Sequence, residues 1–532
     1  MKKIHIIKVL LVVLSFGIVT SCSKDFLDLT PKVNQLAANF YQTESDAMLA
    51  IAAVYNTLVV QPWEFVPIMA DIRSDDAFTG GSNSNDMAQW QEQEHFKMST
   101  TNAAALALWQ RCYDGIYRAN LLLSKMDGIA WTSAANKARC IAECQFLRGY
   151  FYWDLVRHFG WVPILTSVIS DNSILTKLPQ STPDQVYHQV VSDMLAALPN
   201  LPAVISVTET GRVGQDVAKA LLSRIYLYYK GVKTTIPGLG LSGTLTDGTT
   251  TIDDTWAKNA LKAVINSGHF HLLPNYADVF ALGNQNNAEE VFSFQYSQLA
   301  GSSDWGGWGI SGNFSVIFQG PRDPVGDANV VPGWSFGVMT FDLAKEYETG
   351  DPRKAATLYD ASVNLTKYTR GYCNTGYFNS KFLTWKAAQG TKGDPSQNFG
   401  INYPDIRFAD VLLMYAELDM TGGLTYFNQV RTRALGSGAA KGAITLADIQ
   451  HERRVEFGGE GHRCWDLMRW DMNLFATRIA ASWSNIPTGN PMINVTDFTP
   501  YPFIANTYGM FPIPATEIQN SSVLKQFIPA YQ

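Results

Sequence analysis

The sequence has little charge, few cysteines and no long apolar segment, and each shortage excludes a class of protein. Charged residues make up 17% of the chain, the net charge is −6, and no cluster of Lys and Arg occurs, so we expect no nucleic-acid partner. Of the six cysteines, five remain after Cys22, an odd number that leaves at least one thiol unpaired, so we expect no disulfide framework. No C-x-x-C motif occurs. The N-terminal apolar run of roughly a dozen residues is too short for a bilayer crossing, which needs ~20.

That apolar run ends at a cysteine and follows three lysines, which is the arrangement of a secretory signal. The residues Val19-Thr20-Ser21-Cys22 resemble the bacterial lipobox, in which the cysteine is lipidated and becomes the mature N-terminus. We therefore predict a lipoprotein signal peptide over residues 1–21 and a lipid anchor at Cys22. One acyl chain binds a membrane only marginally, so a lasting anchor needs several. An ordinary signal peptide with a chance cysteine is the alternative.

Most of the mature chain has the 3.6-residue hydrophobic period of α-helices. The run Thr182-Pro183-Asp184-Gln185 has the composition of a capping box at a helix start. Cys140 and Cys144 fall on the apolar face of another helix, and we predict that they are buried thiols rather than a metal or redox site. Helices joined by short turns favour stacked antiparallel pairs, so we predict a mostly α, helical-repeat body.

A long polar stretch interrupts the helices at residues 71–86, and Trp90 follows it. It is rich in Gly, Asn and Asp and has no period, and loops longer than about a dozen residues in compact proteins are usually functional or mobile. Its four aspartates allow a calcium site to be considered, but the EF-hand spacing and the Glu at position 12 are absent. We therefore predict no metal here.

A second non-helical region spans residues 291–400 and contains many aromatic residues among Gly, Asn and Ser. It begins with a short alternating strand at 291–296. We predict that this irregular insertion lies between an N-terminal helical region, 22–290, and a C-terminal region, 401–532, that completes the same body. Its oddest feature is Trp305-Gly306-Gly307-Trp308, since two indoles on so flexible a backbone are poorly suited to a core.

The last helical segment, residues 445–470, resembles the C-terminal hallmark of the SusD/RagB family of Bacteroidetes outer-membrane lipoproteins. Further stretches resemble family motifs and occur in the family's order. They are 22–28, 143–149 with 159–163, 405–417 and 511–514. Within the hallmark, acidic and basic residues at helical spacings predict ion pairs that tie helices together rather than a ligand site. These residues are Glu452, Arg453, Arg454, Glu456, Arg463 and Asp466.

The resemblance implies a nutrient-binding lipoprotein on the outer face of the outer membrane. It also implies tetratricopeptide-like helix pairs, and a SusC-like TonB-dependent transporter as the partner that the protein caps. Family ligands are mostly glycans, so we predict capture of an oligo- or polysaccharide, without a cofactor. Some members serve peptide uptake instead, and a RagB-like peptide-uptake lipoprotein is the alternative.

Catalytic motifs are incomplete. His451-Glu452 begins like the H-E-x-x-H zinc motif, but Val455 stands where the second His is required. Neither a G-x-S-x-G motif nor a P-loop occurs. A glycoside hydrolase needs two carboxylates about 5–10 Å apart, a pairing that only a structure reveals. We predict a binding protein and no enzyme, with a surface hydrolase or a purely structural scaffold as the other classes.

The ligand surface is predicted from the chemistry of sugars, whose apolar C–H faces stack on flat rings while their hydroxyls need polar partners. In the family that this chain resembles, the 71–86 region and the insertion supply glycan contacts. The predicted stacking rings are Trp90, Trp305, Trp308 and Trp334. The predicted polar contacts are Arg73, Asp75 and Asn83. The alternative is that some of these indoles only anchor loops onto the helical body.

Overall fold

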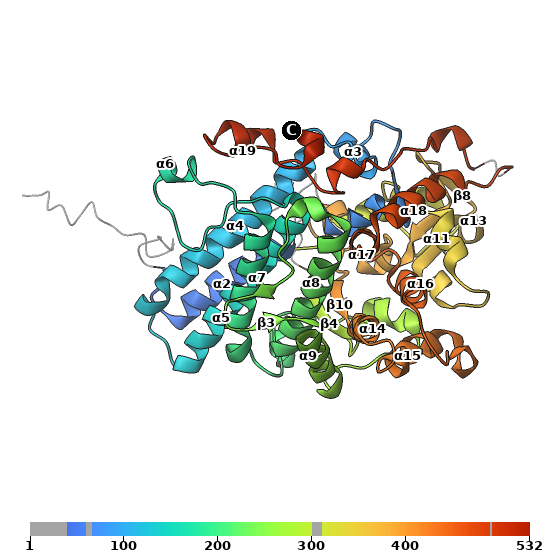
Figure 1. Ribbon diagram of the computed structural model, residues 1–532. Helices are drawn as coiled ribbons and strands as arrows, with labels where there is room; N and C mark the ends of the chain where they lie inside the picture. Colours follow the sequence, from blue (N-terminus) through green and yellow to red (C-terminus); the bar gives the residue numbers. More distant parts are fainter. Residues whose placement is uncertain (1–39, 60–65, 300–310, 490–491) are drawn as a thin grey trace, which may run out of the picture.

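The computed structural model describes residues 40–59, 66–299, 311–489 and 492–532. The predicted signal peptide, Cys22, Trp305 and Trp308 lie outside the described residues. Figure 1 shows a body of long helices at the left and centre, with the shorter elements of the insertion on the right.

Long helices from the N-terminal half pack side by side (Figure 1). They are α2 (Glu44–Val59), α4 (Ala103–Lys125), α5 (Ala134–Phe159), α7 (Pro183–Ala197), α8 (Gln215–Thr235) and α9 (Asp254–Asn266). Helix α4 contacts α5, α5 contacts α7 and α8 contacts α9, as expected for stacked helix pairs. The predicted capping box of α7 is confirmed, since Gln185 N donates to Thr182 Oγ1 and Thr182 N donates to Gln185 Oε1.

The C-terminal helices continue the same hydrophobic core. They are α14 (Phe408–Leu418), α15 (Leu424–Leu435), α16 (Leu446–Phe457), α17 (Arg463–Trp470), α18 (Met472–Ser484) and α19 (Ala515–Gln519). Helix α17 packs on α8, and α14 packs on α9. The prediction of a mostly α, helical-repeat body with an irregular insertion is confirmed.

Strands in the described residues are short and pair antiparallel in twos. The pairs are β1 (Ala77–Gly80) with β6 (Phe336–Met339), β2 (Leu245–Thr246) with β3 (Thr251–Ile252), β4 (Glu290–Phe294) with β10 (Tyr403–Arg407), β5 (Arg322–Val325) with β8 (Lys367–Thr369), and β7 (Leu358–Asp360) with β9 (Tyr377–Asn379). The chain leaves the helical body through β4 and returns through β10 beside it, which closes the insertion at its base. The β1–β6 pair then joins the insertion to the 71–86 stretch.

Short helices fill the rest of the insertion. They are α10 (Ser315–Gln319), α11 (Phe341–Glu346), α12 (Arg353–Thr357) and α13 (Ala361–Asn364). The remaining short helices of the body are α3 (Ala88–Glu94) and α6 (Asn172–Leu175), the latter in a protruding loop at the left of Figure 1.

The cysteines of the described chain are buried and unpaired. Cys140 and Cys144 lie on the inner face of α5 with no exposed surface, so the prediction of buried structural thiols is confirmed. No helix of the described residues is long and apolar enough to cross a membrane.

Charged side chains of α16 and of the Gly458–Gly461 turn after it form a buried charge lattice with the insertion and β10. Arg407 of β10 contacts Glu456 at 2.9 Å and Glu460 at 2.8 Å, and Lys381 contacts Glu460 at 2.7 Å. All four side chains are buried. We use the term buried charge lattice for a set of such residues. They are Arg353, Lys381, Arg407, Arg454, Asp75, Asp76, Glu452, Glu456 and Glu460.

The prediction that the hallmark charges tie helices together is confirmed. Arg453 of α16 pairs with Asp410 of α14 at 2.6 Å and with Asp466 of α17 at 2.8 Å. Arg454 contacts Asp75 and Asp76, each at 2.9 Å, immediately before β1 begins. Breaking such a buried pair leaves an uncompensated charge, which is strongly destabilising. The lattice therefore fixes the segment from which the 81–86 loop leaves the core.

Candidate ligand-binding surface

The exposed part of the predicted polar stretch is a short loop, residues 81–86, at the end of β1. Gly80 and Gly81 both have a positive φ, and a Cβ at Gly80 would lie 2.3 Å from Ser335 O, so only glycine fits this exit from the strand. Gly81 N donates to Ser335 O at 2.7 Å. The two glycines therefore let the chain turn outward while it stays bonded to the insertion.

The 81–86 loop is closed by its own hydrogen bonds. The backbone N and the hydroxyl of Ser82 both donate to Asp86 Oδ2 at 2.7 Å. Asn83 Oδ1 accepts a hydrogen bond from Asn85 N at 2.9 Å. The side chains at 82–85 are exposed, so the loop presents hydroxyl and amide groups on a backbone that is already ordered.

Three segments of the insertion meet this loop around Ser335 and Gly81. Its carbonyl bonds to Gly81, its N donates to Gly320 O at 2.8 Å, and its hydroxyl accepts from Arg322 N at 3.2 Å. Arg322 of β5 then reaches Asp86 Oδ2 at 3.3 Å, and Tyr372 N donates to Gly81 O at 2.8 Å. We call the loop together with these side chains the loop surface. It comprises residues 81–86, Arg322, Trp334 and Tyr372.

The backbone around the loop surface is unusually strained. Eight non-glycine residues of the described chain have a positive φ, and four of them lie in or next to these segments. They are Met87, Asp323, Ser335 and Cys373. Such conformations cost of order 1–3 kcal/mol each and cluster at functional sites, where the surrounding structure imposes them. Their grouping here favours a functional role for this surface.

Trp334 provides the aromatic face of the loop surface. It is half-buried, and its ring stands edge-on against Phe318, with centroids 4.8 Å apart and planes at 83°. Phe318 in turn contacts Trp90, at 4.7 Å between centroids. Trp90 therefore supports the surface from beneath, and Trp334 is the indole nearest to solvent in this stack.

The structure contradicts a direct ligand contact for three predicted residues. Trp90 is 1% exposed and packs between Phe318 and Phe336. Arg73, at 2% exposure, lies over the rings of Trp465 and Phe511 and donates to Gly509 O. The physical reason is that residues 71–80 are not a free loop, since they form the end of a 3-10 helix and strand β1 inside the core.

Asp75 is the third buried residue, with no exposed surface. Burial alone would raise the pKa of this carboxyl, but the guanidinium groups of Arg454 and Arg463 outweigh it and hold the pKa below the usual range. Arg463 Nε contacts Asp75 Oδ1 at 2.8 Å. Asp75 is therefore an internal ion-pair partner in the buried charge lattice, and it has no surface that a ligand could contact.

Two other predicted residues lie where a ligand can reach them. Asn83 is exposed in the loop, and Trp334 is half-buried and directly precedes Ser335, whose carbonyl bonds to Gly81 of the loop. Arg322 and Tyr372 were not predicted, although both belong to the same surface. Arg322 is the single Lys or Arg of the sequence between Lys262 and Lys345, and that signal could have drawn attention to it.

A buried carboxyl lies directly below the loop surface. Glu94 of α3 accepts a hydrogen bond from Thr79 N at 3.1 Å, and its other oxygen has no hydrogen-bond partner among the described residues. His95 Nε2 lies 3.9 Å from that oxygen, and burial lowers the pKa of His95 to about 4, so it supplies no charge at neutral pH. Burial therefore raises the pKa of Glu94 to about 8.

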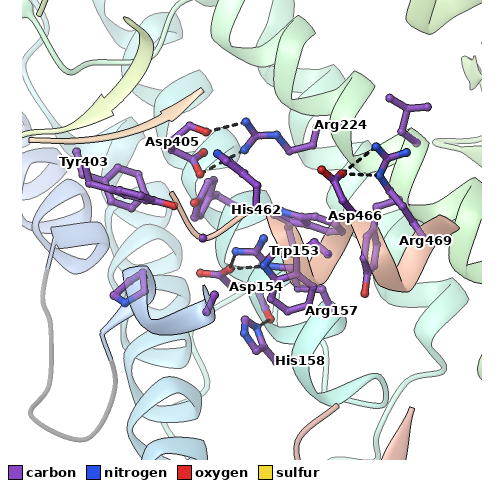
Figure 2. A pocket seen from close by; sticks show the side chains of 18 of the residues that line it. Trp153, Asp154, Arg157, His158, Arg224, Tyr403, Asp405, His462, Asp466 and Arg469 are labelled. Carbon is purple, nitrogen blue, oxygen red and sulfur yellow. Dashed lines mark hydrogen bonds and ion pairs between the residues drawn. The ribbon is translucent and has the colours of Figure 1, made fainter. Parts of the chain in front are cut away.

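A separate polar cavity lies inside the helical body, between α5, α8 and α17 (Figure 2). Its volume is about 60 Å³, whereas ligand sites usually span about 300–1,000 Å³. The charges that line it pair with each other, such as Arg224 with Asp405 at 3.3 Å and Arg469 with Asp466 at 2.8 Å. This cavity has room for a few water molecules and is too small for a saccharide.

The loop surface offers hydroxyl, amide, guanidinium and phenol groups beside one indole. This combination suits a ligand with apolar faces and hydroxyl edges. No group of three or more His, Cys, Asp or Glu residues within the described ranges is arranged to hold a metal ion.

Comparisons with known proteins point to one family. A family model described as "SusD family" matches residues 318–531, and one described as "Starch-binding associating with outer membrane" matches residues 25–227. A "SusD-like protein" of Bacteroides ovatus is 26% identical over 495 residues, which are 87% of this chain and 82% of the relative.

Solved structures agree with the fold. A "Laminarin binding SusD-like protein" is 28% identical with a TM-score of 0.76, and the match covers 91% of this chain and 99% of that one. The surface glycan-binding protein A of Bacteroides thetaiotaomicron, solved with laminarihexaose, is 24% identical with the same TM-score. That match covers 91% of this chain and 100% of the other. At 24% identity the likeness supports the fold alone.

Proposed function

Because the chain belongs to the SusD/RagB family, we propose that it is a glycan-binding protein of the outer membrane that captures an oligo- or polysaccharide without cleaving it. A family description that names starch binding and association with the outer membrane supports this location. The 28%-identical structure named as a laminarin binding SusD-like protein supports the ligand class.

The observation that carries the proposal is the build of the loop surface. A half-buried indole, an exposed amide loop and a guanidinium are held together by hydrogen bonds from three separate segments. Pre-ordered groups lose little freedom on binding, so more of the contact energy appears as affinity. The predicted contacts that fall on this surface are Asn83 and Trp334. Trp305 and Trp308, which lie outside the described residues, remain predicted contacts of the same insertion.

The carboxylates in and next to the loop surface favour binding over hydrolysis. Asp86 accepts hydrogen bonds from Ser82 and faces Arg322, and Asp323 accepts a hydrogen bond from Thr369 at 2.7 Å. A glycosidase requires one carboxyl as a proton donor and a second one free to attack or to activate water. Carboxylates committed to local structure are poorly suited to either role.

Location and partner complete the proposal. Cys22 would carry the lipid anchor and hold the protein on the exterior face of the outer membrane. A SusC-like TonB-dependent transporter would receive the glycan. A stable contact with it would bury on the order of 1,600 Å² or more. Recovery of a large barrel protein with the tagged chain, after mild detergent extraction at native expression, tests this partnership, and recovery of the chain alone would count against it.

The ligand is tested with the purified full-length chain on a glycan array and a peptide array, followed by calorimetry and product analysis of the best ligand. We expect a neutral glycan to bind and to be recovered intact. Trp334→Ala should weaken binding about five- to thirtyfold, since a stacking ring contributes on the order of 1–2 kcal/mol. Trp256→Ala, which removes another half-buried indole on α9, is the matched control and should leave the affinity unchanged.

Each of the other outcomes would support a different function or a different site. Binding of peptides and of no glycan would establish the peptide-uptake alternative. Product release that disappears on mutating one carboxylate would establish a hydrolase. Glycan binding that is equal in wild type and Trp334→Ala would move the site away from the loop surface.

A further inference from the structure

A groove beside α4 lies apart from the loop surface. It is bounded by α4, by the 163–178 segment that contains α6, and by Glu517 of α19 together with Leu524. Its volume is about 540 Å³, within the range of about 300–1,000 Å³ that ligand sites occupy. All the residues that line it are described, and we call it the α4 groove. In Figure 1, α4, α6 and α19 lie at the left, whereas β8 of the insertion lies at the right.

Aromatic side chains line the α4 groove at a fixed interval. Trp109, Tyr113 and Tyr117 are four residues apart, so they stand on one face of the helix. Trp109 is 4% exposed, Tyr113 is half-buried and Tyr117 is 50% exposed, which makes a row of rings that rises from the core to the solvent. Tyr113 donates its hydroxyl hydrogen to Pro163 O at 2.8 Å, which fixes its ring against the opposite wall.

The edge of the α4 groove is polar but almost uncharged. The amide side chains of Gln110 and Asn172 are exposed. Glu517 accepts a hydrogen bond from the Trp109 indole, and burial raises the pKa of its carboxyl. No Lys or Arg lines the groove. A ligand with several negative charges would therefore find no counter-charge here.

We propose that the α4 groove is a second saccharide-binding site, which takes a few neutral sugar units against Tyr117 and Tyr113. This inference rests on the proposed function and adds a second contact point to it. A sugar matches both parts of the groove, since its C–H face stacks on a phenol ring while its hydroxyls pair with Gln110, Asn172 and Glu517. A purely apolar segment would cover these polar groups without pairing them, at a cost of about 1–3 kcal/mol for each.

Two sites on one molecule change how it binds long glycans. A polysaccharide that reaches both the loop surface and the α4 groove binds the second site intramolecularly, at a high effective concentration. Such a chain gains avidity that a short oligosaccharide, held at one site only, lacks. The second site therefore favours capture of polymers over fragments.

The test counts ligands on the purified full-length chain by native mass spectrometry. The probes are laminarihexaose, maltohexaose, cellohexaose, mannohexaose and xylohexaose, and the count is made with whichever binds best. We expect two bound hexasaccharides on wild type, one on Tyr117→Ala and two on Tyr117→Phe, which keeps the ring. Because Tyr117 is half-exposed, its loss should change the melting temperature by less than about 2 °C.

The outcomes separate this inference from the proposed function. One hexasaccharide on wild type, with no change on Tyr117→Ala, would overturn the second site and leave the glycan-binding function standing, as would two on both. Loss of a single bound hexasaccharide on Tyr117→Ala would support the groove and overturn the loop surface as the ligand site. If wild type binds none of the five probes, the neutral-glycan function and the groove site are both overturned.

Discussion

The buried charge lattice and the loop surface are neighbours along the chain but hold their polar groups in opposite environments. Asp75 and Asp76 are paired with Arg454 inside the protein, and only a few residues later the 81–86 loop presents uncharged polar side chains to solvent. The lattice pairs strong charges away from water, where each partner is needed. The surface instead carries hydroxyl, amide and aromatic groups that a neutral ligand can use, beside the partly exposed pair of Arg322 and Asp86. The difference teaches that one polar stretch can be structural in its first half and ligand-facing in its second.

Removal of the lipid anchor at Cys22 is a reference for this comparison, because we expect it to change neither the stability that the lattice provides nor the affinity of the loop surface. We expect Cys22→Ala to lose all labelling by a fatty-acid probe and to leave the membrane fraction. The secreted variant should keep wild-type thermal stability and glycan affinity. Ser23→Ala is the control and should remain labelled. A Cys22→Ala protein that stays labelled and membrane-bound would contradict the lipobox interpretation.

Breaking the buried charge lattice should lower the stability of the protein and leave its affinity for the ligand unchanged. Arg454 is fully buried and pairs with Asp75, Asp76, Asp342 and Glu346. Arg454→Met should lower the free energy of unfolding by about 3–5 kcal/mol, because it leaves the buried Asp76 with no ion-pair partner among the described residues and removes one partner from Asp75, Asp342 and Glu346. Denaturant unfolding followed by fluorescence measures the loss. Arg454→Lys keeps the charge and should cost less.

The contrary result is equally specific. If Arg454→Met unfolds at the wild-type denaturant concentration, the lattice contributes no stability. If the variant, while still folded, binds glycan more than tenfold more weakly, the lattice and the surface are not separate in function.

Glu94, below the loop surface, and Glu346, at the edge of the lattice, should make the stability of the protein depend on pH in opposite directions. Burial raises the pKa of Glu94 to about 8, so the folded protein holds a proton that the unfolded chain loses near pH 4.5. This contribution to stability is therefore full below about pH 4.5 and declines as the pH rises to about 8. We expect Glu94→Gln to abolish the decline and to be more stable than wild type at pH 8 by on the order of 3 kcal/mol, with little difference at pH 5.

Glu346, at the edge of the lattice, is the counterpart. Burial would raise its pKa, but His451 and Arg454 outweigh that and lower it to about 2. Its stabilisation is present above about pH 4.5 and is lost as the pH falls toward 2. Glu346→Gln should therefore reduce stability at pH 7 more than at pH 2.

For Glu94, equal slopes of unfolding free energy against pH for wild type and Glu94→Gln would show that this carboxyl is ionised in the folded protein.

A change at the edge of the loop surface should have the smallest effect. Arg322 is partly exposed and faces Asp86. Arg322→Ala should weaken glycan binding about three- to tenfold, because it removes one charged hydrogen-bond donor, and should alter stability by less than about 1 kcal/mol. Calorimetry measures the affinity. Lys230→Ala, which breaks the exposed pair with Asp254 on the helical body, is the control. Equal affinities of the two variants would remove Arg322 from the site.

The sequence predicted the helices and the hallmark ion pairs because both follow from local spacing. The capping residues of α7 and the acidic and basic positions of α16 are visible within a few residues of one another. The strand predicted at 291–296 is present as β4, at residues 290–294. The fold could therefore be predicted from short-range patterns together with the family resemblance.

The ligand surface was harder to predict because burial depends on distant partners. The buried Asp75 accepts a hydrogen bond from Arg463, which is 388 residues further along the chain. Trp90 and Trp334 are both indoles beside polar loops, and both pack against Phe318. Only the burial of Trp90, which also packs against Phe336, distinguishes the supporting ring from the half-buried one. Arg322 joins the site through Asp86, 236 residues earlier. Composition shows that a loop is polar, but it does not show which of its residues another segment covers.

The central claim is that the loop surface, and not the buried half of the same stretch, holds the glycan. The most direct measurement is a crystal structure of the full-length chain with the hexasaccharide that binds best. We predict a sugar ring stacked on Trp334, with hydroxyls near Asn83 and Arg322, and no displacement of Trp90, Arg73 or Asp75. A ligand found only elsewhere, or one that reaches Asp75 by opening β1, would contradict this account.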